Sequence, residues 1–339
     1  MSETTLLSVE DLIARVAAVF TAARTSEDNA RRVARALVTA EIDGQKGHGL
    51  SRVESYSAGA RAGKIDGFAT PALSQPRAAS MIIDAAHGFA YPAVDLMLEK
   101  LPDAAREAGM VGCAITRSHH CGAIGWHVER LADQGLVALA FANTPDAMAP
   151  WGGGRRLYGT NPIAFAAPQP NGPPAVVDLA LSEVARGKIL NAAQNDQPIP
   201  EGWATDAEGR PTTDAKTALA GTLLPIGGPK GAALAFMVEI LAVALTGANF
   251  AFEASSFFDD KGDPPGVGQF FIAIDPAAFA GKDVFLERMG LIAGLIADDP
   301  ATRLPGSRRY ALREAAAREG ISVNNAMLAR LEELAKAGG

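Results

Sequence analysis

Two apolar runs near the middle of the chain constrain its fold most, because almost nothing separates them. Residues 163–168 (IAFAAP) and 175–180 (AVVDLA) have the composition of β-strands, and only QPNGPP lies between them. Parallel neighbours need a crossover of a dozen or more residues, whereas a short turn rich in Pro, Asn and Gly joins antiparallel ones. The pair therefore predicts a hairpin, and with it a sheet that is not doubly wound.

Around this hairpin, short β-type runs alternate with amphipathic segments, which is the pattern of an α/β protein. The sequence thus predicts a mixed, largely antiparallel sheet. Outside this region the pattern is helical: Ser8 with Asp11, and Thr25 with Asp28, have the spacing of helix N-caps, and the tail beyond residue 276 returns to helices. Further strands are expected at 80–84, 111–116, 136–142 and 268–274, and helices at 92–108, 124–134 and 230–245.

Charge and composition exclude several classes of protein. A formal net charge of −7 argues against general nucleic-acid binding, which needs a basic surface. Two cysteines in 339 residues suggest a reducing compartment, and the N-terminus lacks the pattern of a signal peptide, so we expect a cytoplasmic protein. The longest apolar stretch, 231–252, contains Glu239, which would cost roughly 2.5–3.5 kcal/mol within a bilayer. We expect a buried helix there and no membrane association.

The usual signatures of nucleotide, hydrolase and zinc-protease sites are absent. No G-x-G-x-x-G follows a predicted strand, and the sequence has no P-loop, no G-x-S-x-G and no H-E-x-x-H. If the chain binds a dinucleotide, it does so without the Rossmann fingerprint.

The segment RSHHCGAIGWH (117–127) holds three of the five histidines between a predicted strand and a predicted helix. A zinc site is disfavoured, because His127 would lie about 10 Å along a helix from His120, and we expect no metal. Backbone amides at the helix start, with Gly122 permitting close approach, could instead hold a phosphate. An ordinary strand-to-helix turn remains the alternative.

Two other loops combine glycine or proline with basic residues. PIGGPKGAAL (225–234) places Lys230 near a helix start, where a cation opposes the helix dipole, and RLPGSRRY (303–310) gathers three arginines around a turn. Either loop alone is typical of a solvated turn. With the histidine-rich segment, they favour one extended polyanionic ligand such as a dinucleotide in an otherwise acidic protein.

KGHGLSRVESY (46–56) sets His48 between two glycines, with Arg52 four positions later. Either this is an ordinary turn after a helix, or His48 meets a small anion that needs a proton. Histidine titrates near neutral pH and suits general acid catalysis, and the guanidinium fork matches a carboxylate. YGTNPIAFAAP (158–168) and DLALSEVARGK (178–188) bring further polar residues to the ends of apolar runs, as either a helix surface or a pocket rim.

Taken in order, these segments resemble the malate/L-lactate dehydrogenase type 2 family of NAD(P)-dependent oxidoreductases, which lack a Rossmann fold. The resemblance runs from about residue 8 to 330 and includes GHGLSRVESY, SHHCGAIGWH, APWGGGRRLYGTNPIAFAAP, VVDLALSEVARGKILNAAQ, IPEGWATDAEGRPTTD and LLPIGGPKGAAL. It implies a non-Rossmann, mixed-sheet NAD(P)-binding domain at 76–275. A helical domain for substrate and dimer contacts would combine residues 1–75 with C-terminal helices at 276–339.

The resemblance also implies the reaction. DAAHGFAYPAVD (84–95) is more similar to the branch that reduces Δ1-piperideine-2-carboxylate and Δ1-pyrroline-2-carboxylate than to the 2-oxo-acid branches. A 2-oxo-acid/2-hydroxy-acid dehydrogenase of the malate, lactate, sulfolactate, ureidoglycolate or diketogulonate type is the alternative, and a non-catalytic small-anion binding protein is a remote one. The expected cofactor is NADPH, with NADH as the other choice, and the expected assembly is a homodimer.

Roles follow position by position from the same resemblance. His48 matches the proton donor, and Arg52 matches the residue that holds the substrate carboxylate; Thr160, Arg186 and Gly187 match further substrate contacts. Many relatives have a serine before the catalytic histidine, where this chain has Gly47, so a serine relay is not expected here. The cofactor contacts fall at His120, Cys121, Gly122, Ala123, Ile124, Asp178, Leu179, Ala180, Pro229, Lys230, Leu304, Pro305, Gly306, Ser307, Arg308, Arg309 and Tyr310.

Overall fold

The computed structural model describes residues 3–337, and a sheet of seven strands organises them. Its strand order is β2-β3-β4-β10-β5-β6-β7, and only β3 and β4 run parallel. The hairpin predicted from QPNGPP is β6–β7, so the mixed, largely antiparallel sheet is confirmed. The strands are β1 (Thr4–Leu7), β2 (Ala72–Arg77), β3 (Ser80–Asp84), β4 (Met110–Ser118), β5 (Val137–Ala142), β6 (Ile163–Ala167), β7 (Ala175–Leu179), β8 (Ala204–Thr205), β9 (Pro211–Thr212), β10 (Val267–Ile274) and β11 (Ile321–Asn324).

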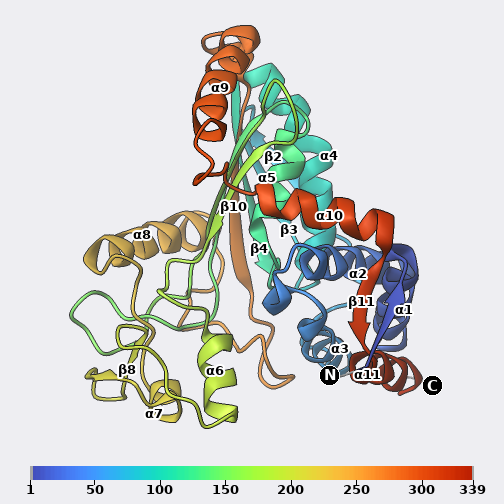
Figure 1. Cartoon of the computed structure of the whole chain (residues 1–339), viewed down its shortest axis with the longest axis vertical. Coiled ribbons are helices and arrows are strands. Elements are labelled where there is room, and N and C mark those ends of the chain that lie inside the picture. The colour runs from blue at the N-terminus through green and yellow to red at the C-terminus, as the bar shows by residue number, and fades with distance from the viewer. Residues whose placement is uncertain (1–2, 338–339) are drawn as a thin grey trace.

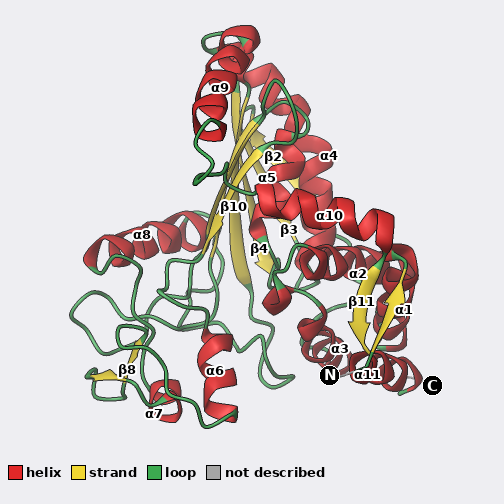
Figure 2. Ribbon diagram, in the orientation of Figure 1, coloured by secondary structure: helices red, strands yellow, loops and turns green. Residues whose placement is uncertain are grey.

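Helices cover this sheet and extend beyond it, as Figures 1 and 2 show. The α-helices are α1 (Val9–Ala22), α2 (Glu27–Ile42), α3 (Val53–Ala62), α4 (Ala90–Ala108), α5 (Ile124–Ala132), α6 (Arg186–Gln194), α7 (Ala215–Ala220), α8 (Pro229–Glu239), α9 (Lys282–Ala297), α10 (Ser307–Glu319) and α11 (Asn325–Lys336). A π-helical turn, Ile240–Ala244, continues α8.

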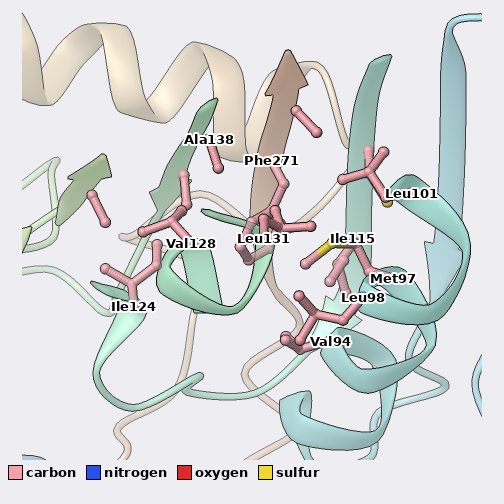
Figure 3. Packing of buried hydrophobic residues seen from close by; sticks show 14 of the residues in the cluster. Val94, Met97, Leu98, Leu101, Ile115, Ile124, Val128, Leu131, Ala138 and Phe271 are labelled. Carbon is pink, nitrogen blue, oxygen red and sulfur yellow. The ribbon is translucent and has the colours of Figure 1, made fainter. Parts of the chain in front are cut away.

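The two faces of the sheet pack against different layers because side chains alternate along each strand. On one face, Phe271 of β10 and Ile115 of β4 meet Met97 of α4 and Val128 of α5 in a continuous apolar core (Figure 3). On the other face, Phe270 belongs to a second cluster shared with α6, α7 and α8. The core of the sheet is therefore closed on both sides.

The two ends of the chain meet in a third cluster, built from α1, α2, α3 and α11. β1 pairs antiparallel with β11, and Figure 1 shows α1, α11 and β11 together on one side of the molecule. The N- and C-terminal segments thus share one small sheet and one core. The division into domains at 75 and 275 remains a prediction.

Two expectations need correction. The cap of α2 is Ser26, which accepts from the Asn29 amide, and not Thr25, whose side chain is buried. The apolar stretch at 231–252 is not a buried helix: its small residues, such as Ala235, face the core, while Phe236 and Leu245 are more than half exposed. Small residues let the helix lie close to the sheet, which leaves its large side chains on the outer face. Within residues 3–337, no helix is both long and apolar enough for a bilayer.

Candidate active site

The turn after α2 fixes the position of His48. Two short 3₁₀ turns, Lys46–His48 and Leu50–Arg52, lead directly into α3. Gly49 permits this path, because a β-carbon there would lie 2.4 Å from Glu41 Oε2, which accepts from the Leu50 amide at 3.1 Å. At Gly47, by contrast, a β-carbon would meet nothing within 4 Å. Packing therefore does not require glycine at position 47.

Arg52 presents a free guanidinium edge beside His48. Its Nε donates to the Gly47 carbonyl at 2.7 Å, which fixes the side chain against the turn. Its Nη1 is buried and has no hydrogen-bond partner within residues 3–337. The ring of Phe258 lies over the guanidinium carbon, 4.4 Å from it. A buried donor without a partner is costly, so this edge is suited to an external acceptor such as a carboxylate.

His48 lies on the His120 ring, with centroids 5.1 Å apart and planes 25° from parallel. Its Nδ1 is buried and lacks a partner in the described part of the chain. Burial, followed by the charge of Arg52, lowers the pKa of His48 to about 4, and Asp178 opposes this shift. The imidazole is therefore neutral at pH 7. A carboxylate on Arg52 would offset the positive charge and raise the His48 pKa toward that of a useful acid.

His120 and Tyr56 form the support under His48. Burial raises the pKa of the Tyr56 hydroxyl and lowers that of His120, so both are neutral. The Tyr56 hydroxyl and His120 Nδ1 share a hydrogen bond, which holds the imidazole in place beneath His48. The sequence segment around His120 is thus brought to His48, as the predicted site requires.

The other histidines of 117–127 have different environments. His127 Nε2 donates to the Cys121 carbonyl at 2.8 Å and so stabilises the turn into α5. His119 is fully enclosed, with Tyr56 at its edge and Phe257 5.0 Å away. Within residues 3–337, no three His, Cys, Asp or Glu side chains are arranged to hold a metal ion.

The sequence predicts a phosphate site at the start of α5. The structure places the side chain of Asp178 there instead. Asp178, at the end of β7, accepts from the Gly125 amide at 3.1 Å and from the Gln45 side chain at 3.0 Å. A carboxylate is a favourable group at a helix N-terminus. A phosphate at these amides would be repelled by Asp178, so this helix start does not suit one. Contacts of His120 to Ile124 with another part of a cofactor remain a prediction.

The segment 304–310 packs along the edge strand β7. Pro305 accepts from the Val176 amide at 3.0 Å, and the Tyr310 hydroxyl donates to the Pro174 carbonyl at 2.9 Å. Arg309 Nη1 is buried and lies 3.9 Å from Asp178. The structure therefore brings Asp178 and Arg309 together, close to the start of α5, while Ser307 and Arg308 are exposed.

Thr160 and the segment that precedes α8 both contact Leu181, which follows β7. The Leu181 amide donates to the Thr160 carbonyl at 2.8 Å, and its carbonyl accepts at 2.9 Å from the amide of Ile226, three residues before Pro229. Leu179, Lys230 and Gly187 are exposed. Arg186 is less close: it donates to the Leu219 carbonyl, and burial and then the charge of Arg156 lower its pKa. No contact found within residues 3–337 joins Arg186 to His48.

Sequence reasoning missed the loop that covers Arg52. Phe257 and Phe258 come from a polar segment, EASSFFDDKGDP, and contact His120 and Arg52 respectively. Lys64, which holds this loop, was also missed. Two adjacent aromatic residues in a polar segment are the signal that could have identified the loop.

Comparisons with known proteins agree on the family of this site. The model of the malate/L-lactate dehydrogenase family matches residues 7–332. The chain is 52% identical over 281 residues, 83% of each protein, to the (2R)-3-sulfolactate dehydrogenase (NADP(+)) of Chromohalobacter salexigens. It is 42% identical over 322 residues to the Δ1-pyrroline-2-carboxylate/Δ1-piperideine-2-carboxylate reductase of Pseudomonas putida, covering 94% of this chain and 93% of the relative.

Among solved structures, the crystal structure of Δ1-piperideine-2-carboxylate reductase from Pseudomonas syringae pv. tomato matches with a TM-score of 0.92. It is 39% identical, and the match covers 98% of this chain and 100% of that one.

Proposed function

Because the chain belongs to the malate/L-lactate dehydrogenase family, we propose that it is an NADPH-dependent reductase of cyclic imino acids. As a member of this family it is an NAD(P)-dependent oxidoreductase. The proposed reactions convert Δ1-piperideine-2-carboxylate to L-pipecolate and Δ1-pyrroline-2-carboxylate to L-proline. The relatives named as reductases of these two imines support this substrate class.

The observation that carries the proposal is the free edge of Arg52 beside the unpartnered Nδ1 of His48. In this arrangement Arg52 holds the substrate carboxylate, which places the adjacent C=N bond next to the imidazole. NADPH, when bound, supplies the hydride that adds to C2. His48 provides the proton that the nitrogen needs, and its pKa rises once the carboxylate offsets the charge of Arg52.

Cations beyond the end of β7 support a phosphorylated cofactor whose phosphate lies away from Asp178 and the start of α5. Arg309 Nη1 is buried without a hydrogen-bond partner in the described chain, and Arg308 and Lys230 are exposed cations close to the ends of two loops. Arg308 and Arg309 are proposed to hold the ribose end of NADPH, because a guanidinium matches a 2′-phosphate. NADP(+) in the name of one relative supports this preference.

A second candidate function is reduction of a 2-oxo acid of the sulfopyruvate type. The relative that is 52% identical is named a sulfolactate dehydrogenase, and this identity exceeds the 42% shared with an imine reductase. Both substrates carry a carboxylate for Arg52. They differ in the second half of the molecule, which is an apolar ring in one and a sulfonate in the other.

A panel of substrates tests the proposal. Oxidation of NADPH and NADH is followed with Δ1-piperideine-2-carboxylate, Δ1-pyrroline-2-carboxylate, sulfopyruvate, oxaloacetate, pyruvate and oxalurate. The proposal predicts the highest kcat/KM for a cyclic imine with NADPH. A kcat/KM at least tenfold higher for sulfopyruvate would transfer the assignment to the second candidate.

We also propose that the enzyme is a cytoplasmic homodimer. The outer faces of α8 and α9 carry large exposed apolar side chains, among them Phe236 and Leu295, and such surfaces are typical of association sites. A second copy of this chain is the proposed occupant. Light scattering at micromolar concentration should give twice the mass of the chain, and a fully active monomer would contradict it.

A further inference from the structure

A loop of unusual composition closes over the Arg52 side of the site. Residues 249–266 leave the end of the α8 region and return to β10, and two hydrogen bonds from Asn249 close the loop. Its backbone amide donates to Gly266 at 2.9 Å, and its side chain donates to Pro265 at 3.0 Å. Figure 1 shows the loop, in light orange, running from the lower end of β10 toward α3. Its tip carries Phe257 and Phe258.

Lys64 holds the tip of this loop. It follows α3, is only 4% exposed, and its Nζ donates to three oxygens: the Ser256 carbonyl at 2.7 Å, the Asp259 carbonyl at 3.1 Å and Asp259 Oδ1 at 3.4 Å. A lysine is rarely buried unless its charge is paired. These acceptors lie on both sides of Phe257 and Phe258, so the ammonium group fixes the part of the backbone that carries the two rings.

The two rings face different partners. Phe257 is buried against His119 and His120, with centroid distances of 5.0 and 5.1 Å. Phe258 is 52% exposed and lies over the guanidinium of Arg52. Because Phe258 is half exposed, it contributes little hydrophobic stabilisation, and its defined contact is with the Arg52 guanidinium. Stacking on an aromatic face fixes the plane of a guanidinium and leaves its edge free for a planar anion.

We propose that Phe258 determines substrate specificity in the carboxylate pocket, and that Lys64 is the residue that positions it. The inference rests on the proposed function of Arg52. The ring holds the guanidinium plane in the orientation that accepts a carboxylate and shields that ion pair from water, which strengthens it. The same ring offers an apolar surface to the rest of the substrate. It favours a cyclic imine and disfavours a second anionic group such as a sulfonate, which would lose hydration there.

The first experiment uses binding, which does not depend on turnover. Pyrrole-2-carboxylate, a planar ring with a carboxylate at C2, is titrated into the full-length protein loaded with NADP+ by isothermal titration calorimetry. Phe258→Ala should weaken binding roughly three- to thirtyfold, the range expected for a cation–π contact. Phe258→Tyr should retain near-wild-type affinity. Phe252→Ala is the matched control, because Phe252 is on the same loop and 48% exposed but stacks on Phe250 instead.

The second experiment tests whether Lys64 acts through Phe258. Lys64→Met should weaken binding of the same probe in the wild-type background and have no further effect in the Phe258→Ala background. Thermal unfolding shows whether each variant folds. If Lys64→Met does not fold, the Phe258 variants alone test the inference. An equal effect of Lys64→Met in both backgrounds would overturn the positioning role.

The kinetic outcomes separate this inference from the proposed function. In Phe258→Ala, KM for the imine should rise while kcat changes less, and the preference for the imine over sulfopyruvate should fall. If the imine is reduced and KM is unchanged in this variant, the inference fails and the function stands. If no imine is reduced but the variant still weakens probe binding, the carboxylate role of Phe258 stands and the proposed function fails. Wild-type protein that does not bind the probe would overturn the inference.

Discussion

Two buried polar groups lie close together near the end of α2, and they differ in whether their atoms are paired. In the group around His48, the imidazole Nδ1 and Arg52 Nη1 are buried without partners within residues 3–337. A few residues earlier, Asp43 accepts from Arg313 at both oxygens, each at 2.6 Å, and Glu129 accepts from the same guanidinium. The side chains of Asp43 and Glu129 are 0% and 6% exposed, so both carboxylates are buried against Arg313.

The two groups show that buried polar side chains can have two different roles. The Arg313 cluster joins α2, α5 and α10, three helices distant in sequence, and its charges satisfy one another. It is a structural connection. The His48 group has donors and acceptors that nothing in the described chain satisfies, and such atoms destabilise a fold unless a ligand completes them. Variants in the two groups should therefore fail in different ways.

The largest effect is expected at His48. His48→Ala should lower kcat by roughly 10²–10⁴-fold with a modest change in KM, because a proton donor acts mainly in the transition state. The thermal midpoint should not fall, since the variant removes an unsatisfied buried group. Steady-state kinetics on an imine and a 2-oxo acid check this, and an imine that arrives already protonated should show the smaller deficit. A near-wild-type kcat on both substrates would make His48 structural.

Arg313→Met should produce the opposite result, a large loss of stability with little effect on chemistry. It leaves Asp43 and Glu129 buried without their cation, and breaking such a pair costs about 3–5 kcal/mol. Chemical denaturation measures the loss. Arg318→Ala on the same helix is the control: its pair with Glu319 is exposed, so we expect at most about 1 kcal/mol. Equal losses in the two variants would contradict the comparison.

The histidines of the site should also make the protein sensitive to acid. Burial, with the charges of Lys64 and Arg52, lowers the pKa of His119 to about 3, whereas an unfolded histidine titrates near 6.5. Between these values the unfolded state binds more protons, so the stability present above pH 6.5 is lost as the pH falls.

At pH 5 the loss from His119 alone is about 2 kcal/mol. His119→Gln should remove that part of the decline between pH 7.5 and 5, as measured by denaturation at each pH. His87→Asn, at a partly exposed position with positive φ that asparagine tolerates, removes a different histidine and is the matched control. If both variants follow the wild-type curve, His119 is not the source of the acid sensitivity.

The sequence predicted most of the sheet because its hairpin and its helices are local patterns. The strands of the first small sheet, β1 and β11, were not predicted, since each is short and gains its partner only from the other end of the chain. The predicted N-cap of α2, Thr25, is one residue before the observed cap, Ser26. Both residue types are good N-caps, and only the burial of Thr25 in the folded chain decides between them.

The candidate site shows the same limit. His48 and Arg52 could be predicted because they share one turn, and the resemblance gave them roles. Asp178 was predicted as a cofactor contact, but its hydrogen bond to the start of α5 could not be predicted, because it joins segments far apart in sequence. The same holds for the bonds from Lys64 to the loop that carries Phe258. Unpaired atoms such as Arg52 Nη1 become visible only when every neighbour is in place.

The smallest effect separates the two arginines proposed for the cofactor. Arg309 is largely buried, donates to the Val176 carbonyl at 3.3 Å and lies beside Asp178. Its guanidinium is therefore partly paired within the protein, as that of Arg313 is. Arg308 is exposed. An exposed ion pair with a 2′-phosphate contributes up to about 1 kcal/mol, so Arg308→Ala should lower the NADPH/NADH ratio of kcat/KM about two- to fivefold.

Arg309→Ala should change this ratio too, but with a loss of thermal stability that Arg308→Ala lacks, because it removes a contact to β7 and the cation beside Asp178. Arg303→Ala is the control for general charge, being exposed on the same segment but outside the positions assigned to the cofactor. An unchanged ratio in both the Arg308 and Arg309 variants would place the 2′-phosphate elsewhere, and the exposed Lys230 at the start of α8 would then be the next cation to replace.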